Sequence, residues 1–198
     1  VATSAVRDAA AQPAATSAQG TAPIADWDFN NGNQGWAAQN QSQVSAEDGR
    51  LHVTSTGNDP FIGVTVQGPA GWKTLTLRVR TPQNLNSQLF WTTTAEPGTS
   101  ESKSVRFRLR SRGSRFRETV IYFHTAAPLR SLRLDPHSQP IALDIARITL
   151  QTSGPPPAEP ATDPAAFKTP PGFQVELLYS VPKTLQGSWV SLTVDTRG

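Results

Sequence analysis

Residues 75–80 read Leu-Thr-Leu-Arg-Val-Arg, and residues 105–110 read Val-Arg-Phe-Arg-Leu-Arg. In both stretches an apolar side chain alternates with a polar one, which is the pattern of a β-strand with one dry face. Turn-forming pairs such as Asp48-Gly49 separate these runs from their neighbours. Seven to nine short strands, with no convincing amphipathic helix, predict an all-β fold of the jelly-roll β-sandwich type. The same alternation recurs in residues 51–54, 120–124, 132–135, 143–145 and 148–150.

The composition excludes several kinds of site from the chain. Its 198 residues include no cysteine, so disulfides, thiolate metal sites, cysteine nucleophiles and covalently attached haem are excluded from it. The sequence has no apolar run of about 18 residues, so we expect no membrane span.

The chain divides into four zones. Residues 1–22 are rich in Ala, Ser, Thr and Gln, which predicts a disordered spacer left after removal of a signal peptide and a secreted, periplasmic or cell-surface protein. Residues 23–151 carry the strand patterns of the sandwich. Residues 152–169 contain Pro155-Pro156-Pro157 and predict a semi-stiff linker. Residues 170–198 resume a strand pattern.

Basic side chains concentrate in residues 103–117, which hold seven basic residues and no acidic one. Alternation places Arg106, Arg108 and Arg110 in one row, and Arg78 joins them if its strand is a neighbour. Such a field favours an anionic partner. A solvated outer face is the first interpretation and an acidic polysaccharide the second. Nucleic acid ranks last, because aromatic side chains for base stacking are sparse there.

The segment Gln88-Leu89-Phe90-Trp91 combines aromatic and amide side chains, which together suit the apolar faces and hydroxyl groups of sugars. Alternation makes either Phe90 or Trp91 a core residue and leaves the other open to a ligand. Loop carboxylates at 59 and 135 are expected at the same end of the sandwich. The predicted ligand-binding residues are Trp91, Gln88, Asp59, Arg78, Arg108, Arg133 and Asp135.

Catalytic patterns are weak in this sequence. No spacing singles out a pair of carboxylates for glycoside hydrolysis, and no G-x-S-x-G turn accompanies the histidines. We therefore predict no catalytic residue. A structural Ca²⁺ that joins the first strand at Asp28 to the last at Asp144 is the one metal site considered, and the alternative is that both are ordinary turn or edge residues.

Several motifs in residues 24–151 resemble those of the galactose-binding-like jelly-roll modules, which are akin to carbohydrate-binding modules. The resemblance implies a secreted module that binds polysaccharide or oligosaccharide. The motifs are Trp27-Asp28-Phe29, Gly35-Trp36, Asp48-Gly49-Arg50-Leu51, Asn58-Asp59-Pro60, Gln88-Leu89-Phe90-Trp91 and Leu132-Arg133-Leu134-Asp135-Pro136.

The segments 167–179 and 186–195 are similar to the entry of the β-propeller in the haem-binding, membrane-bound-dehydrogenase-like proteins of planctomycetes. The resemblance implies that a truncated propeller follows the linker, and that propeller and haem domains of the same parent chain are partners of the sandwich. The haem cysteines of that family are not in this sequence, so no haem is assigned to it.

Three functions follow from these patterns. The first is a non-catalytic carbohydrate-binding module that tethers a larger secreted redox protein to a polysaccharide, neutral or acidic. The second is a structural or docking domain with no ligand of its own. The third, ranked lowest, is a glycan-active enzyme. Nucleic acid is not expected as a partner.

Overall fold

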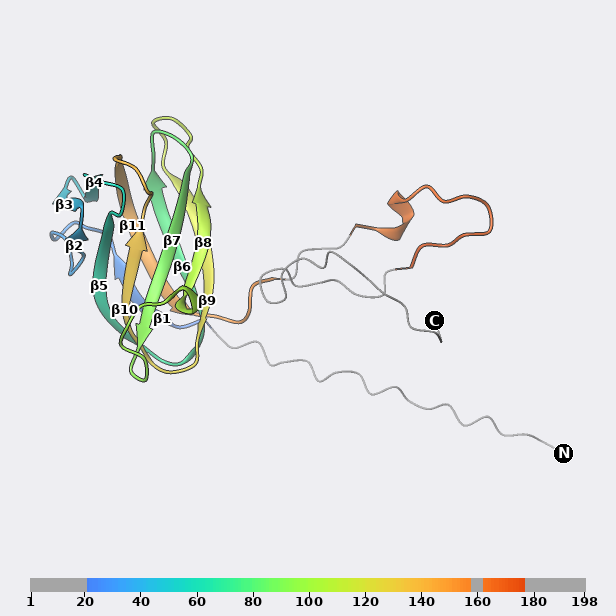
Figure 1. The fold of residues 1–198 in the computed structure, drawn as a ribbon, viewed down its shortest axis with the longest axis horizontal. Coiled ribbons are helices and arrows are strands. Elements are labelled where there is room, and N and C mark those ends of the chain that lie inside the picture. The colour runs from blue at the N-terminus through green and yellow to red at the C-terminus, as the bar shows by residue number, and fades with distance from the viewer. Residues whose placement is uncertain (1–20, 158–161, 177–198) are drawn as a thin grey trace. The chain divides into compact units, whose positions relative to one another are not determined.

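The computed structural model describes residues 21–157 and 162–176 and shows an all-β molecule (Figure 1). Within those residues the helical elements are two short 3₁₀ turns, η1 (Glu101–Lys103) and η2 (Pro164–Ala166). None of the described helices is long and apolar enough to cross a membrane. The strands are β1 (Pro23–Trp27), β2 (Ala37–Asn40), β3 (Ser42–Glu47), β4 (Arg50–Ser55), β5 (Phe61–Gly68), β6 (Gly71–Arg80), β7 (Leu85–Thr93), β8 (Ser104–Leu109), β9 (Arg117–Thr125), β10 (Leu129–Asp135) and β11 (Ala142–Thr152).

The strands form two antiparallel sheets that pack face to face as a sandwich (Figure 1). The six-strand sheet has the order β3-β4-β11-β6-β9, and β1 also pairs with β11. The first part of β11 pairs with β4 and its last part with β1 on the same side. The five-strand sheet has the order β2-β5-β10-β7-β8. The prediction of an all-β jelly-roll sandwich is confirmed.

The core lies between the sheets and follows the predicted alternation. On β6 the side chains of Leu75, Leu77 and Val79 are buried, whereas Arg78 between them is exposed. Each sheet has a second face, turned away from the core, which we call its outer face. Because successive side chains point to opposite faces, the polar half of each alternating run lies on an outer face.

The turn between β3 and β4 shows how local sequence sets the register. Asp48 and Gly49 both adopt positive φ, at 51° and 66°, and Glu47 pairs with Arg50 on either side of them. Two central residues with positive φ make the tight hairpin turn whose twist matches that of antiparallel strands. The Asp-Gly pair therefore fixes the register of β3 on β4.

The chain divides into two units, with the boundary between Gly154 and Pro155. All the described strands belong to the first unit. In the second, residues 162–176 contain η2 and turns but no strand. The propeller-like pattern predicted for residues 170–198 otherwise lies outside the described residues, and so does the spacer predicted for residues 1–22, apart from its last two residues.

Candidate functional site

The outer face of the five-strand sheet gathers aromatic, amide and charged side chains from neighbouring strands. In the register of the sheet, Asp135 of β10 lies opposite Gln88 of β7, and Gln88 lies opposite Arg106 of β8. Cross-strand neighbours on one face lie about 5 Å apart. The three side chains therefore form a continuous polar row across the sheet.

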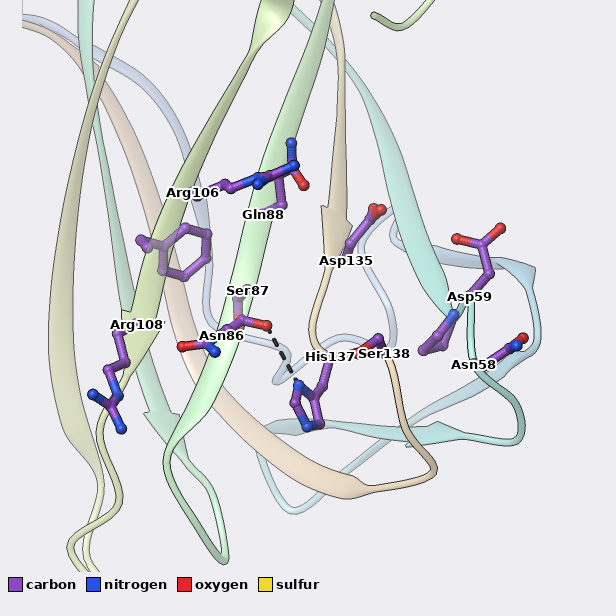
Figure 2. Close-up of a pocket in the computed structure, with 12 residues that line it drawn as sticks. Asn58, Asp59, Asn86, Ser87, Gln88, Arg106, Arg108, Asp135, His137 and Ser138 are labelled. Carbon is purple, nitrogen blue, oxygen red and sulfur yellow. Dashed lines mark hydrogen bonds between the residues drawn. The ribbon is translucent and has the colours of Figure 1, made fainter. Parts of the chain in front are cut away.

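A groove of about 710 Å³ lies at the end of this face, where the loop before β5 and the loop after β10 meet β7 and β8. Figure 2 shows Arg106 and Arg108 on one side, Asn58 and Asp59 on the other, and His137 between them. The groove is lined by Asn58, Asp59, Pro60, Asn86, Ser87, Gln88, Arg106, Phe107, Arg108, Asp135, His137 and Ser138.

Arg133 of β10 stands beside this groove between two phenyl rings. Its guanidinium carbon lies 3.5 Å from the ring centroid of Phe61 and 4.9 Å from that of Phe90. Stacking of a guanidinium on an aromatic face is favourable, most of all where water is partly excluded. The side chain of Arg133 therefore covers both rings.

Two carboxylates contact the guanidinium of Arg133, which is stacked on the two rings. Nε and Nη2 donate to the two carboxylate oxygens of Asp135 at 2.7 and 2.6 Å, which is a bidentate ion pair. Asp59 adds a longer contact of 3.7 Å to the same Nη2. Burial raises the pKa of Asp135, Arg133 opposes that shift, and the charges of Asp59 and Glu101 add to it.

The loop that carries Asp59 is tied to the segment at the end of β2. The side-chain amide of Asn40 donates to the carbonyl oxygen of Asp59 at 2.7 Å and to its carboxylate at 3.1 Å. The backbone N–H of Asp59 in turn donates to the side chain of Gln41 at 3.0 Å. Hydrogen bonds from the segment at the end of β2 thus position Asp59 on this wall of the groove.

The opposite wall is braced by η1. The amide of Gln88 donates to Glu101 at 2.9 Å and to the hydroxyl of Ser104 at 2.8 Å. Arg106 lies 3.3 Å from the same carboxylate of Glu101. Arg108, by contrast, has no hydrogen-bond or ion-pair partner among the described residues, so its guanidinium is available to a ligand.

The floor of the groove is set by bonds between β7 and the loop after β10. The hydroxyl of Ser87 donates to the carbonyl of Pro136 at 2.6 Å. Nδ1 of His137 lies 3.4 Å from the carbonyl oxygen of Asn86, the contact dashed in Figure 2. These bonds place His137 and Ser138 beside Asn86.

Four of the predicted ligand-binding residues meet in this groove, and a fifth stands beside it. Asp59, Gln88, Arg108 and Asp135 line it, and Arg133 contacts both carboxylates. These residues come from the loop before β5 and from β7, β8 and β10, and the four strands β5, β10, β7 and β8 are neighbours in the sheet order.

The expectation that Trp91 faces a ligand is wrong. Trp91 belongs to the core, is 7% exposed, and its ring lies 4.9 Å from the ring of Phe123 in the facing sheet. Alternation holds, since the outward position is Phe90, but Arg133 covers that ring. No exposed tryptophan therefore accompanies the groove among the residues that line it.

The condition under which Arg78 would join the arginines of β8, that its strand is a neighbour of theirs, is not met. Arg78 is on β6, in the six-strand sheet, and β8 is in the five-strand sheet. The polar faces of the two sheets point away from each other, so Arg78 and Arg108 lie on opposite faces of the sandwich. Arg78 instead lies 5.8 Å from the ring of Phe116.

The two residues predicted to hold calcium are engaged by different neighbours. Asp144 accepts from Nδ1 of His52 at 2.6 Å and from Arg80. Burial tends to raise its pKa, but Arg80 and His52 outweigh that effect and lower it. Asp28 accepts from the backbone and side chain of Asn30 and from Gln34, and these bonds lower its pKa.

Within residues 21–157 and 162–176, no group of three or more His, Asp or Glu side chains is placed to hold a metal ion. Calcium at Asp28 and Asp144 stays a prediction.

Some groove residues were not among the ligand-binding residues that the sequence predicted. Asn86 and Arg106 are the neighbours, by alternation, of the predicted Gln88 and Arg108, and that spacing was a signal for them. His137 and Ser138 lie in the loop after β10, which has no strand period. No pattern in the sequence indicates that this loop folds back on β7.

No protein-family model and no curated protein matches this chain. Solved structures do match its fold. The apo BiXyn10A module CBM1 has a TM-score of 0.52 and 11% identity, over 66% of this chain and 99% of its own. The CBM22-1 xylan-binding domain of Paenibacillus barcinonensis Xyn10C has a TM-score of 0.52 and 13% identity, over 67% and 96%.

A mutant of the family 29 carbohydrate-binding module CBM29-2 gives a TM-score of 0.52 at 8% identity, over 68% of this chain and 87% of its own. The K3 adhesin domain of Lys-gingipain from Porphyromonas gingivalis gives 0.50 at 12% identity, over 68% and 100%. At such identities the likeness shows the fold alone. That fold is the jelly-roll sandwich of residues 21–154.

Proposed function

We propose that the sandwich is a non-catalytic carbohydrate-binding module, and that its ligand lies in the groove at the end of the five-strand sheet. The observation that carries this proposal is the groove itself, a hollow of about 710 Å³ on an outer sheet face. Convergent polar side chains in a concave site are what an oriented, hydroxyl-rich ligand needs. The carbohydrate-binding modules among the structures of similar fold support the same function.

The chemistry of the groove suits sugar hydroxyl groups. The side-chain amides of Asn58 and Asn86 are exposed, and each offers both a donor and an acceptor. Phe107 also lines the groove, although its side chain is on the inward face of β8 and packs against the core, so only its exposed part can meet the C–H face of a sugar. Arg108 adds a free cation. A polar groove with a small apolar wall favours a sugar over an apolar ligand.

The carboxylates of the groove are poorly placed for glycoside hydrolysis. Both oxygens of Asp135 accept hydrogen bonds from Arg133, and the same guanidinium contacts Asp59. A general acid must turn its proton toward the glycosidic oxygen. The bidentate pairing of Asp135 with Arg133 supports a binding role for this carboxylate rather than a catalytic one.

We further propose that the module tethers a larger secreted redox protein to its polysaccharide. The support for this is the sequence: the prolines at 155–157, and the resemblance of residues 167–179 and 186–195 to the entry of a propeller. A tethered domain gains effective concentration at the surface to which its module binds.

One observation favours the alternative of a structural or docking domain. Trp91 is buried in the core, and Arg133 covers the rings of Phe61 and Phe90. This face therefore lacks the open aromatic platform that the sequence analysis expected. Under the alternative, the chain binds no polysaccharide.

Affinity gel electrophoresis of the 198-residue chain tests the proposal, with gels that contain xylan, hydroxyethylcellulose, galactan or polygalacturonate. We expect retardation by at least one of them. The double substitution Asn58→Ala/Asn86→Ala should weaken the underlying affinity about 30-fold, because it removes two hydrogen-bonding amides worth about 1 kcal/mol each. Neither side chain makes a hydrogen bond within the described part of the protein, so the fold should be unaffected.

The matched control is Gln43→Ala/Ser45→Ala, two exposed positions on the outer face of the six-strand sheet. This variant should migrate like the unsubstituted chain in every gel. Migration unaffected by all four polysaccharides would refute carbohydrate binding and favour the structural role. Equal weakening in both variants would place the ligand elsewhere.

A further inference from the structure

Arginines crowd the hairpin that joins the two sheets. This hairpin consists of β8, the loop 110–116 and β9, and it leads from the five-strand sheet to the six-strand sheet. Residues 103–117 contain seven basic side chains and no acidic one. The local field of such a segment attracts anions.

Most of these cations lack an ion-pair partner within residues 21–157 and 162–176. Lys103 pairs with Glu96 at 3.0 Å and Arg106 with Glu101 at 3.3 Å. Four exposed arginines form no ion pair and no side-chain hydrogen bond with any described residue. We call this set the arginine tract: Arg108, Arg110, Arg112 and Arg115.

The loop that carries the arginine tract is held in place by hydrogen bonds. The backbone N–H of Ser111 donates to the side chain of Asn84 at 2.9 Å, and its hydroxyl donates to the carbonyl of Thr81 at 2.8 Å. The N–H of Arg115 donates to the carbonyl of Arg112 at 3.3 Å. A loop whose backbone is already ordered does not have to be ordered on binding, so only the arginine side chains lose conformational freedom.

The arginine tract begins at the groove and extends along the hairpin. Arg108 lines the groove itself, and Arg110, Arg112 and Arg115 follow it along the hairpin. On the far side of the loop, Gly113 and Ser114 line a second hollow of about 330 Å³. The loop is thus a basic ridge between two hollows, and a long ligand that leaves the groove at Arg108 meets it.

We propose that the arginine tract binds the anionic groups of an acidic polysaccharide, a polymer of uronic acid type, whose chain continues from the groove over the hairpin. This inference rests on the proposed function and names its ligand class. Guanidinium groups match planar carboxylates through two parallel N–H···O bonds. The uncharged amides of the groove contact the hydroxyl groups of the same chain.

The aromatic side chains near the tract argue against nucleic acid. Single strands are held by stacking of bases on open aromatic rings. Phe116, the aromatic residue of the loop, has the guanidinium groups of Arg78 and Arg80 within 5.8 and 5.1 Å of its ring centroid. Because the guanidinium groups cover the ring of Phe116, the loop presents positive charge but no open aromatic ring on which a base could stack.

The test compares two variants with the same change of net charge. Arg112→Gln/Arg115→Gln removes half of the tract, and Arg130→Gln/Lys168→Gln removes two exposed cations elsewhere. Binding to polygalacturonate, dextran sulfate, xylan and the oligonucleotide poly(dT) is measured at pH 7 from low to high salt. The 198-residue chain should bind polygalacturonate, with affinity that falls as salt rises.

The tract variant should bind polygalacturonate about 5- to 25-fold more weakly, since an exposed charged contact is worth up to about fivefold in affinity. Its salt dependence should be shallower, and the control variant should be unchanged. Binding of dextran sulfate with the same losses would extend the ligand class to sulfated chains.

Three results would overturn the inference: no binding to polygalacturonate, equal losses in both variants, or tighter binding to poly(dT) than to polygalacturonate. Binding to xylan alone, unchanged in the tract variant, would refute the arginine tract while leaving the proposed function intact. Absence of binding to every polysaccharide would refute both.

Discussion

Lys73 carries an amino group into the interior of the sandwich. It occupies an inward position of β6, next to Leu75 on the same face, and is 0% exposed. Nζ donates to the carbonyl of Gly71 at 3.1 Å and to the hydroxyl of Thr125 at 2.8 Å. Within the described residues no carboxylate pairs with it, and burial lowers its pKa to about 8.

The stability of the protein should therefore rise with pH above about 8. In the unfolded chain a lysine keeps its proton up to a pKa of about 10.4, whereas folded Lys73 releases it near 8. Between these values the unfolded state binds more protons, so the free energy of unfolding increases with pH. We expect a gain of about 2 to 3 kcal/mol between pH 8 and 10.5 in urea unfolding.

The substitution Lys73→Met is the control for that prediction. A methionine of similar length has no proton to release, so the rise attributable to this position should vanish. The variant should also be more stable than the unsubstituted chain at pH 7, where the buried charge is present. An equal rise in both proteins would show that other groups are responsible.

The pair Phe90 and Trp91 shows what alternation does and does not predict at a single residue. The period of two correctly places the two rings on opposite faces of β7. It does not say which face is buried in the core, because both rings are large and apolar. Both are only 7% exposed, since Arg133 from the neighbouring strand covers the outward ring.

Among the elements, β9 tests the sandwich most directly, because it is an edge strand with two unlike faces. Ile121 is 3% exposed in the core, and its neighbour Val120 is 50% exposed on the outer face. Ile121→Ala should cost about 2 to 5 kcal/mol of unfolding free energy, from lost burial and a residual cavity.

Val120→Ala is the matched change on the other face of the same strand. It should cost less than about 1 kcal/mol, which is the range of strand propensity. Chemical denaturation followed by tryptophan fluorescence measures both. A larger loss for Val120 than for Ile121 would mean that the strand faces the other way and that the sandwich described above is incorrect.

The alternation of apolar and polar residues did not predict the short strands β2 and β3. β2 reads Ala-Ala-Gln-Asn, and β3 contains Val44 as its largest apolar residue. Neither has an alternation strong enough to predict a strand. Their pairing with β5 and β4 comes from the sheets on which they lie.

At the scale of the whole molecule, the described strands and their core belong to the unit that ends at Gly154. The backbone N–H of Ser153 still donates to the carbonyl of Trp72 at 3.0 Å, so the sandwich closes just before the boundary. A chain cut after Gly154 should unfold within about 2 °C of the full chain, since 1 kcal/mol corresponds to about 2 to 8 °C. Differential scanning calorimetry measures this shift.

If the unfolding midpoint of the cut chain fell by more than about 5 °C, residues 155–198 would stabilise the sandwich. The sandwich would then not be an independent unit that ends at Gly154. A chain that ends four residues earlier, at Leu150, serves as the positive control. It removes the last residues of β11, which pair with Lys73 and Thr74 of β6, and should lower the midpoint clearly.

The sequence by itself determined which side chains of a strand share a face, because in an extended chain that division depends only on adjacent residues. It therefore predicted the all-β sandwich, the Asp48-Gly49 turn, and a shared face for Arg106, Arg108 and Arg110. Only the tertiary structure decided which strands share a sheet, since strand pairing joins segments far apart along the chain. Strand pairing put Arg78 on the opposite face from Arg108 and brought Asp59 to Arg133, and the packing of the two sheets buried Trp91 against Phe123.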